Sequence, residues 1–214
     1  MWRVLIAFIT ACSAIASVGQ QPAANIGAGT VTGHQYRSSF FKLGYEFPKA
    51  WTYLKQDTVN AENEEAYRKA VDKSLKENGP DSTTVSGNTT TSRKTEVSTP
   101  VNLLIAGPAA ITSSASDAAP RVRIWAHRRN AILDKAGDHA TMIATMAKKV
   151  ILPPTEITLS GRTFVRVDVI HNDGLYHSNV ETVCGDYVVG FDFYASTEKD
   201  LRTLTETINT VRFE

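Results

Sequence analysis

The sequence predicts an α+β fold in which an antiparallel β-sheet is flanked by helices. Two patterns indicate this class. In the last third of the chain, three apolar stretches are joined by short glycine-containing turns, an arrangement typical of β-hairpins. Elsewhere, apolar residues recur every three to four positions, as in helices that pack one face against a sheet.

The composition is that of one globular domain. The chain has 214 residues, 42% of them hydrophobic, and 23 Lys and Arg stand against 22 Asp and Glu. A formal charge of +1 gives no basic field to hold nucleic acid, so we expect no nucleic-acid partner.

Residues 1–16 predict a signal peptide. Arg3 precedes an apolar run of 13 residues, and small residues favour cleavage before Ser17. Because a bilayer span needs roughly 20 residues, we expect no transmembrane anchor and a secreted or periplasmic protein. In the alternative, the residues ending at Cys12 resemble a bacterial lipobox, and Cys12 carries a lipid that anchors an envelope lipoprotein. Cleavage before Ser17 leaves Cys184 as the single cysteine, which we expect to be a packed thiol.

The first half of the domain alternates strands with one helix. Residues 17–32 are rich in Gly, Ala and Gln and predict a flexible lead-in, so the domain is expected to cover 33–214. Strands are predicted at 34–38, 43–47 and 51–54, and a helix at 62–78. Half of the residues in 79–100 are Ser or Thr, which predicts a disordered insertion.

The second half supplies most of the predicted sheet. Strands are expected at 101–106, 121–127, 164–171, 175–184 and 187–194. A helix capped by Asp138 should extend to Val150 and stop at Pro153 and Pro154. The closing helix begins at Ser196 or Thr197 and buries an apolar stripe made of Leu201, Leu204, Ile208 and Val211.

The register of the last three strands decides which residues share a face. If Asp173 and Gly174 form a two-residue loop, Arg166 lies opposite Glu181 and three alternating valines of the preceding strand enter the core. Gly185 and Asp186 form the second two-residue loop. A slip of one residue would bury Glu181, Asn179 and His177, at about 1 to 3 kcal/mol for each polar group left unpaired.

This register places polar residues together on the outward face. Asp168, His177 and Asp192 are candidate metal ligands, because carboxylates and an imidazole would lie on adjacent strands. A possible binding face adds Arg166, Asn179, Glu181 and Tyr194, with Arg121, Arg123 and His127 as an anion or partner patch. The simpler alternative is a solvated sheet face on which Arg166 and Glu181 form an ordinary ion pair. The sequence contains no catalytic or cofactor-binding motif, so we expect no enzyme and no cofactor.

Two segments resemble the PsbP-like family. The opening motif contains Phe41, Leu43, Tyr45, Phe47, Pro48 and Trp51. The ending, a closing helix followed by a short strand, contains Leu204, Ile208, Thr210, Val211, Arg212 and Phe213. The resemblance covers about 33–214 and implies an α/β/α sandwich, with the Ser/Thr-rich segment as an insertion.

The resemblance also implies a role in binding. Members of the family, among them an extrinsic subunit of photosystem II and secreted bacterial proteins, share no common active site. The expected function is therefore that of a non-catalytic extracytoplasmic binding or accessory protein with an unknown protein or small-molecule partner. The alternative is a small-molecule or metal-handling protein, or a hydrolase, built around Asp168, His177 and Asp192.

Overall fold

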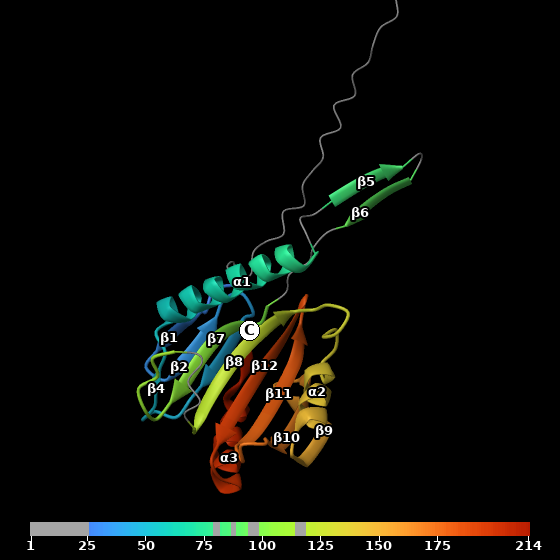
Figure 1. The fold of residues 1–214 in the computed structure, drawn as a ribbon. Coiled ribbons are helices and arrows are strands. Elements are labelled where there is room, and N and C mark those ends of the chain that lie inside the picture. The colour runs from blue at the N-terminus through green and yellow to red at the C-terminus, as the bar shows by residue number, and fades with distance from the viewer. Residues whose placement is uncertain (1–25, 79–81, 87–88, 94–98, 114–118) are drawn as a thin grey trace, which may run out of the picture.

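The computed structural model describes residues 26–78, 82–86, 89–93, 99–113 and 119–214 (Figure 1). The predicted signal peptide, Cys12 and residues 17–25 lie outside these ranges. No helix within them is long and apolar enough to cross a membrane.

A seven-stranded antiparallel sheet forms the centre of the fold, as the fold class predicted. Its strands lie in the order β4-β7-β8-β12-β11-β10-β9. Their bounds are β4 Thr52–Tyr53, β7 Val101–Gly107, β8 Arg121–Arg128, β9 Lys149–Leu159, β10 Arg162–Ile170, β11 Tyr176–Cys184 and β12 Tyr187–Ala195.

One face of this sheet, the core face, packs against a smaller sheet and a helix. The smaller sheet has the order β1-β2-β3-β13 and is built from β1 Thr30–Thr32, β2 Gln35–Ser38, β3 Leu43–Glu46 and β13 Arg212–Phe213. Tyr45 of β3 meets Phe191 of β12 edge to face, with ring centroids 5.7 Å apart. Rings and branched side chains from both sheets form the main apolar core, which explains the aromatic alternation of the opening motif.

The chain closes with α3 Glu198–Thr205, a short 3-10 helix η2 Glu206–Thr210 and β13. Thr197 caps α3 by accepting a hydrogen bond from the amide of Asp200. The predicted stripe is buried in the main core, where α3 packs on β12 and β11. The closing helix, its cap and the terminal strand are thus confirmed.

Two helices cover parts of the opposite face, the helix face. Val59 of α1 Gln56–Asn78 packs with Ile105 of β7, and Ile143 of α2 Asp138–Met146 packs with Val167 of β10. Figure 1 shows α1 along the β7 side of the sheet and α2 beside β10 and β9. Strands β8 and β12 lie between these two sides.

The described parts of two segments predicted to be irregular contain regular structure. The lead-in is partly packed, because Ile26 and Ala28 are buried and β1 pairs with β2. Within 79–100, β5 Ser82–Ser86 and β6 Thr89–Arg93 form an antiparallel pair. Threonine favours strands, so a Thr-rich segment with few apolar residues can still form a hairpin.

The predicted stop at Pro153 and Pro154 was wrong. The helix ends at Met146, and the prolines lie inside β9. β9 is an edge strand, and its pairing with β10 shifts register opposite Val167, so neither proline has to donate a ladder hydrogen bond. Val150, predicted on the helix stripe, is an exposed strand residue.

The loop between β10 and β11 has three residues instead of two. His171 accepts a hydrogen bond from the amide of Gly174 and donates its own amide to Leu175, while Gly174 has a φ of 87°. Arg166 consequently pairs with Val180, and Val165 pairs with Glu181. The predicted register was therefore wrong by one residue, and every side chain of β10 faces the side opposite to the prediction.

Candidate functional site

The register of the second hairpin was predicted correctly. Gly185 and Asp186 form its loop, so Asn179 pairs with Asp192 and His177 pairs with Tyr194. Combined with the slip in the first hairpin, this places the polar residues of β11 on the same face as the valines of β10. They lie inside the protein rather than on a solvated face.

Asp192 is the centre of a buried hydrogen-bond network. The side chain of Asp192 has no exposed surface. Its Oδ1 accepts from His177 Nε2 at 3.0 Å and from Asn179 Nδ2 at 2.9 Å. Its Oδ2 accepts from Nε and Nη2 of Arg123, which lies on the neighbouring strand β8. One buried carboxylate thus links three adjacent strands.

The charge of Asp192 is stabilised by these donors. Burial by itself raises the pKa of the carboxyl, but the guanidinium of Arg123 and the hydrogen bonds from His177 and Asn179 lower it more. The net result is a pKa well below the usual range of an aspartate. Asp192 is therefore a permanent anion at neutral pH, and His177 Nε2 must carry a proton to donate to it.

His171 extends the network toward the surface. Its Nε2 lies 2.9 Å from Nδ1 of His177, so the two imidazoles share one proton between these nitrogens. The rings are nearly parallel, with centroids 5.0 Å apart. Burial, together with the neighbouring His177, lowers the pKa of His171. The lowered pKa favours the neutral form of His171, and the chain of hydrogen bonds from His171 through His177 ends on Asp192.

Tyr194 and Arg121 cover the network from the side of β8. The ring of Tyr194 stacks on His177 at 4.3 Å, and the guanidinium carbon of Arg121 lies 4.3 Å from the centroid of Tyr194. Burial and the charge of Asp192 raise the pKa of Tyr194 to about 12. Arg121, Arg123 and Tyr194 remain partly exposed, and we call these three residues the strip.

Glu181 does not form the predicted ion pair with Arg166 and instead binds the beginning of α2. Its Oε1 accepts hydrogen bonds from the amides of Gly137 and Ala140, and its Oε2 lies 3.5 Å from Nδ1 of His139. A carboxylate at the beginning of a helix accepts hydrogen bonds from amides that have no partner within the helix, and its negative charge interacts favourably with the positive end of the helix dipole. Asp138, predicted as the cap, instead accepts from the amides of Asp134 and Lys135.

The outward side of β8 is more buried than its alternation indicated. Trp125 is 4% exposed and His127 is 7% exposed, although His127 was predicted to lie in a binding patch with Arg121 and Arg123. Trp125 lies over Gly190, where any β-carbon would overlap the indole, and its ring meets His139 edge to face at 4.8 Å. His127 therefore does not join Arg121 and Arg123 in an exposed patch.

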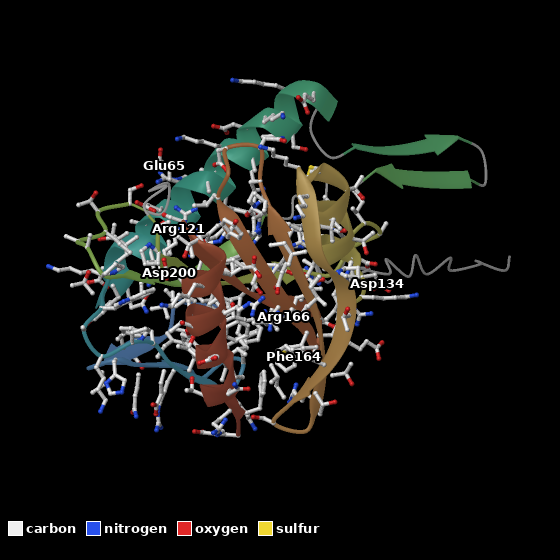
Figure 2. All side chains as sticks on the ribbon, turned by 90° about the horizontal axis from the view of Figure 1, so that it is seen from below. Glu65, Arg121, Asp134, Phe164, Arg166 and Asp200 are labelled. Carbon is white, nitrogen blue, oxygen red and sulfur yellow. The ribbon has the colours of Figure 1, made fainter. Side chains whose placement is uncertain are left out.

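The predicted metal site does not form. Asp168 pairs with Ser178 on the core face, whereas His177 and Asp192 lie on the helix face. Asp168 instead accepts two hydrogen bonds from Arg166, at 2.9 and 2.7 Å. Figure 2 shows Arg166 and Phe164 well apart from Arg121. Within the described part of the chain, no three His, Cys, Asp or Glu side chains are arranged to hold a metal.

Two members of the network had no direct signal in the sequence. Arg123 reaches Asp192 only because β8 pairs with β12. No turn joins these two strands directly, so turn chemistry could not predict their pairing. His171 directly precedes the predicted turn, and only the three-residue loop brings it to His177. The Asn179 to Asp192 contact, in contrast, follows from the correctly predicted second loop.

Comparison with known proteins gives a structural likeness. No family model matches the sequence, and a comparison with curated proteins gives no match. Among solved structures, the chain is similar to the solution structure of cyanobacterial PsbP (CyanoP) from Synechocystis sp. PCC 6803. The TM-score is 0.44 and the identity 9%, over 87% of this chain and 96% of that chain. The likeness concerns the arrangement of the chain alone, and no property of that protein is transferred to this one.

Proposed function

We propose that this protein is a non-catalytic binding or accessory protein that acts outside the cytoplasm. The observation that carries the proposal is the closed state of its polar network. Both oxygens of Asp192 are occupied by Arg123, His177 and Asn179, and the carboxylate has no exposed surface. A group so enclosed is suited to stabilising a scaffold rather than to reaching a substrate.

The strip is the proposed contact surface. Asp192 fixes the guanidinium of Arg123 by two hydrogen bonds, and Tyr194 is held between His177 and Arg121. Arginine and tyrosine side chains contribute strongly to binding when they are already ordered, because less conformational entropy is lost. The strip lies on β8 and β12, between the regions covered by α1 and α2.

Site-specific photocrosslinking tests the contact. A photoreactive residue replaces Arg121 in one variant and the exposed Ile132 in a matched control. We expect the first variant alone to give a discrete product in the native envelope fraction, competed away by unlabelled protein and reproduced with the purified partner. The strip would be excluded as the contact surface if both positions gave equal products, or if unlabelled protein did not reduce any crosslinked product.

The location is tested separately. We expect the native protein to begin near Ser17 and to be recovered outside the cytoplasm. Mass analysis of its N-terminus distinguishes this from lipidation, because a diacylglyceryl group on Cys12 would replace secretion by membrane anchoring. An unprocessed cytoplasmic chain would contradict both forms of the proposal.

A further inference from the structure

A cluster of three aromatic rings lies at one end of the molecule, away from the strip. Phe40, on the turn between β2 and β3, is 49% exposed. Its ring meets Phe41 at 4.8 Å and Tyr187 at 5.6 Å, both edge to face, and Phe41 meets Tyr187 at 5.6 Å. Each ring thus orders the other two, although Phe40 remains half in water.

A hollow of about 320 Å³ lies beside this cluster. The lining consists of the three rings with Lys42, Arg162, Cys184, Gly185 and Asp186. Its volume is in the range of pockets that hold a small ligand or a side chain of a partner. Hot spots of protein interfaces are rich in aromatic and arginine side chains, as this lining is.

Arg162 brings a positive charge to this hollow. Its guanidinium carbon lies 4.2 Å from the centroid of Phe213, and Nη1 lies 3.7 Å from the sulfur of Cys184. Among the described residues, neither Arg162 nor Lys42 forms an ion pair with a carboxylate. Against these two cations the lining contains one carboxylate, Asp186. The net charge of the lining therefore favours an anion.

We propose that this hollow binds a segment of a protein partner in which a bulky apolar side chain lies next to a carboxylate. The apolar side chain enters beside Phe40, Phe41 and Tyr187, where it covers aromatic surface that is otherwise wet. The carboxylate meets Arg162. One face of the Arg162 guanidinium lies on Phe213, which leaves N–H groups at the edge of the guanidinium to donate to a carboxylate. The two carboxylate oxygens can accept two parallel hydrogen bonds from these groups. This site is independent of the strip.

Cys184 provides a reporter inside the hollow. Burial raises the pKa of its thiol, so alkylation at neutral pH is slow and sensitive to further covering. In a full chain carrying Cys12→Ser, Cys184 is the single thiol. The probe is a capped peptide with one Phe flanked by two Glu. We expect saturating peptide to slow the alkylation of Cys184.

Matched variants and matched probes define the site. Arg162→Gln and Phe40→Ala should each weaken peptide protection about tenfold, while Ile132→Ala and Arg68→Gln, on exposed residues elsewhere, should leave it unchanged. A peptide with Lys in place of Glu, or Ser in place of Phe, should protect little. Phenylpropionate, which has the same chemistry in one small molecule, should protect weakly.

Three results would overturn the proposal. Equal protection by the lysine peptide would remove the role of charge, and unchanged protection in both Arg162→Gln and Phe40→Ala would place the peptide elsewhere. Protection by phenylpropionate but by no peptide at millimolar concentration would make the hollow a small-molecule site. Circular dichroism of each variant verifies the fold, and retained crosslinking through the strip separates this site from the proposed function.

Discussion

His177 donates a hydrogen bond to Asp192 across two adjacent strands, and the carboxylate that accepts it is completely buried. The pair is surrounded by donors, since Arg123 and Asn179 use the remaining acceptor positions and His171 meets the other imidazole nitrogen of His177. Polar groups that satisfy one another lose little on burial, whereas isolated ones are costly. The stability of the sheet should therefore depend on each member of the network.

Replacing Asp192 by Asn tests this dependence. The change keeps the shape of the side chain but leaves Arg123 without its counterion and replaces one acceptor oxygen by an NH2 donor that faces another donor. We expect a loss of about 3 kcal/mol in the free energy of unfolding, measured in urea at pH 7. Asp72→Asn, on the exposed side of α1, is the control and should change stability by less than about 0.5 kcal/mol. Similar values for both variants would contradict a structural role for the network.

Acid should destabilise the protein in two steps. The pKa of His171 is lowered by burial, so the unfolded chain takes up this proton first, and stability should decrease as the pH falls below about 6.5. The pKa of Asp192 is lowered by its partners, so a second decrease should begin near pH 4. Unfolding in urea between pH 8 and pH 3 measures both. His171→Gln should remove the first step and Asp192→Asn the second, and a rise in stability on acidification would contradict the assignment.

Glu181 should be necessary for the order of α2. In Glu181→Gln, the helix loses the negative charge that accepts from the amides of Gly137 and Ala140. We expect a loss of about 1 to 2 kcal/mol and faster hydrogen exchange at these two amides. Glu156→Gln, on the exposed edge strand β9, serves as the control. Unchanged exchange at Gly137 would mean that the cap is unimportant.

Gly190 should tolerate no side chain. A β-carbon there would overlap the indole of Trp125, and we expect Gly190→Ala to cost about 2 kcal/mol or more, with a shift in tryptophan fluorescence. Gly44→Ala is a matched strand substitution, because a β-carbon at Gly44 meets nothing within 4 Å. If both variants unfold at the same urea concentration, the packing of Trp125 on Gly190 has no energetic importance.

The β5 and β6 hairpin should be dispensable. These strands pair with one another in a sheet separate from the other two. Replacing 79–98 by a short Gly and Ser linker should change the melting temperature by no more than about 4 °C, the equivalent of roughly 1 kcal/mol in a domain of this size. A larger decrease would show that the hairpin contributes to the core.

Local patterns predicted the elements of the fold, and long-range pairing decided the site. The stripe from Leu201 to Val211 and the loop at Gly185 and Asp186 follow from spacing and turn chemistry, so they were predictable. The loop before Leu175 was not, because Gly174 suits both a two-residue and a three-residue hairpin. Burial then favoured the wrong register, since the cost of burying Glu181 was counted without the amides of α2 that compensate it.

The two prolines of β9 also limit how this protein can associate with itself. β9 is the last strand on its side of the seven-stranded sheet, and an uninterrupted edge would offer a row of amides to a strand from another copy. Pro153 and Pro154 carry no amide hydrogen, and the irregular pairing opposite Val167 bends the edge where they occur. A second chain therefore finds no continuous ladder to extend, and growth of the sheet into fibrils through β9 is blocked at the middle of the strand.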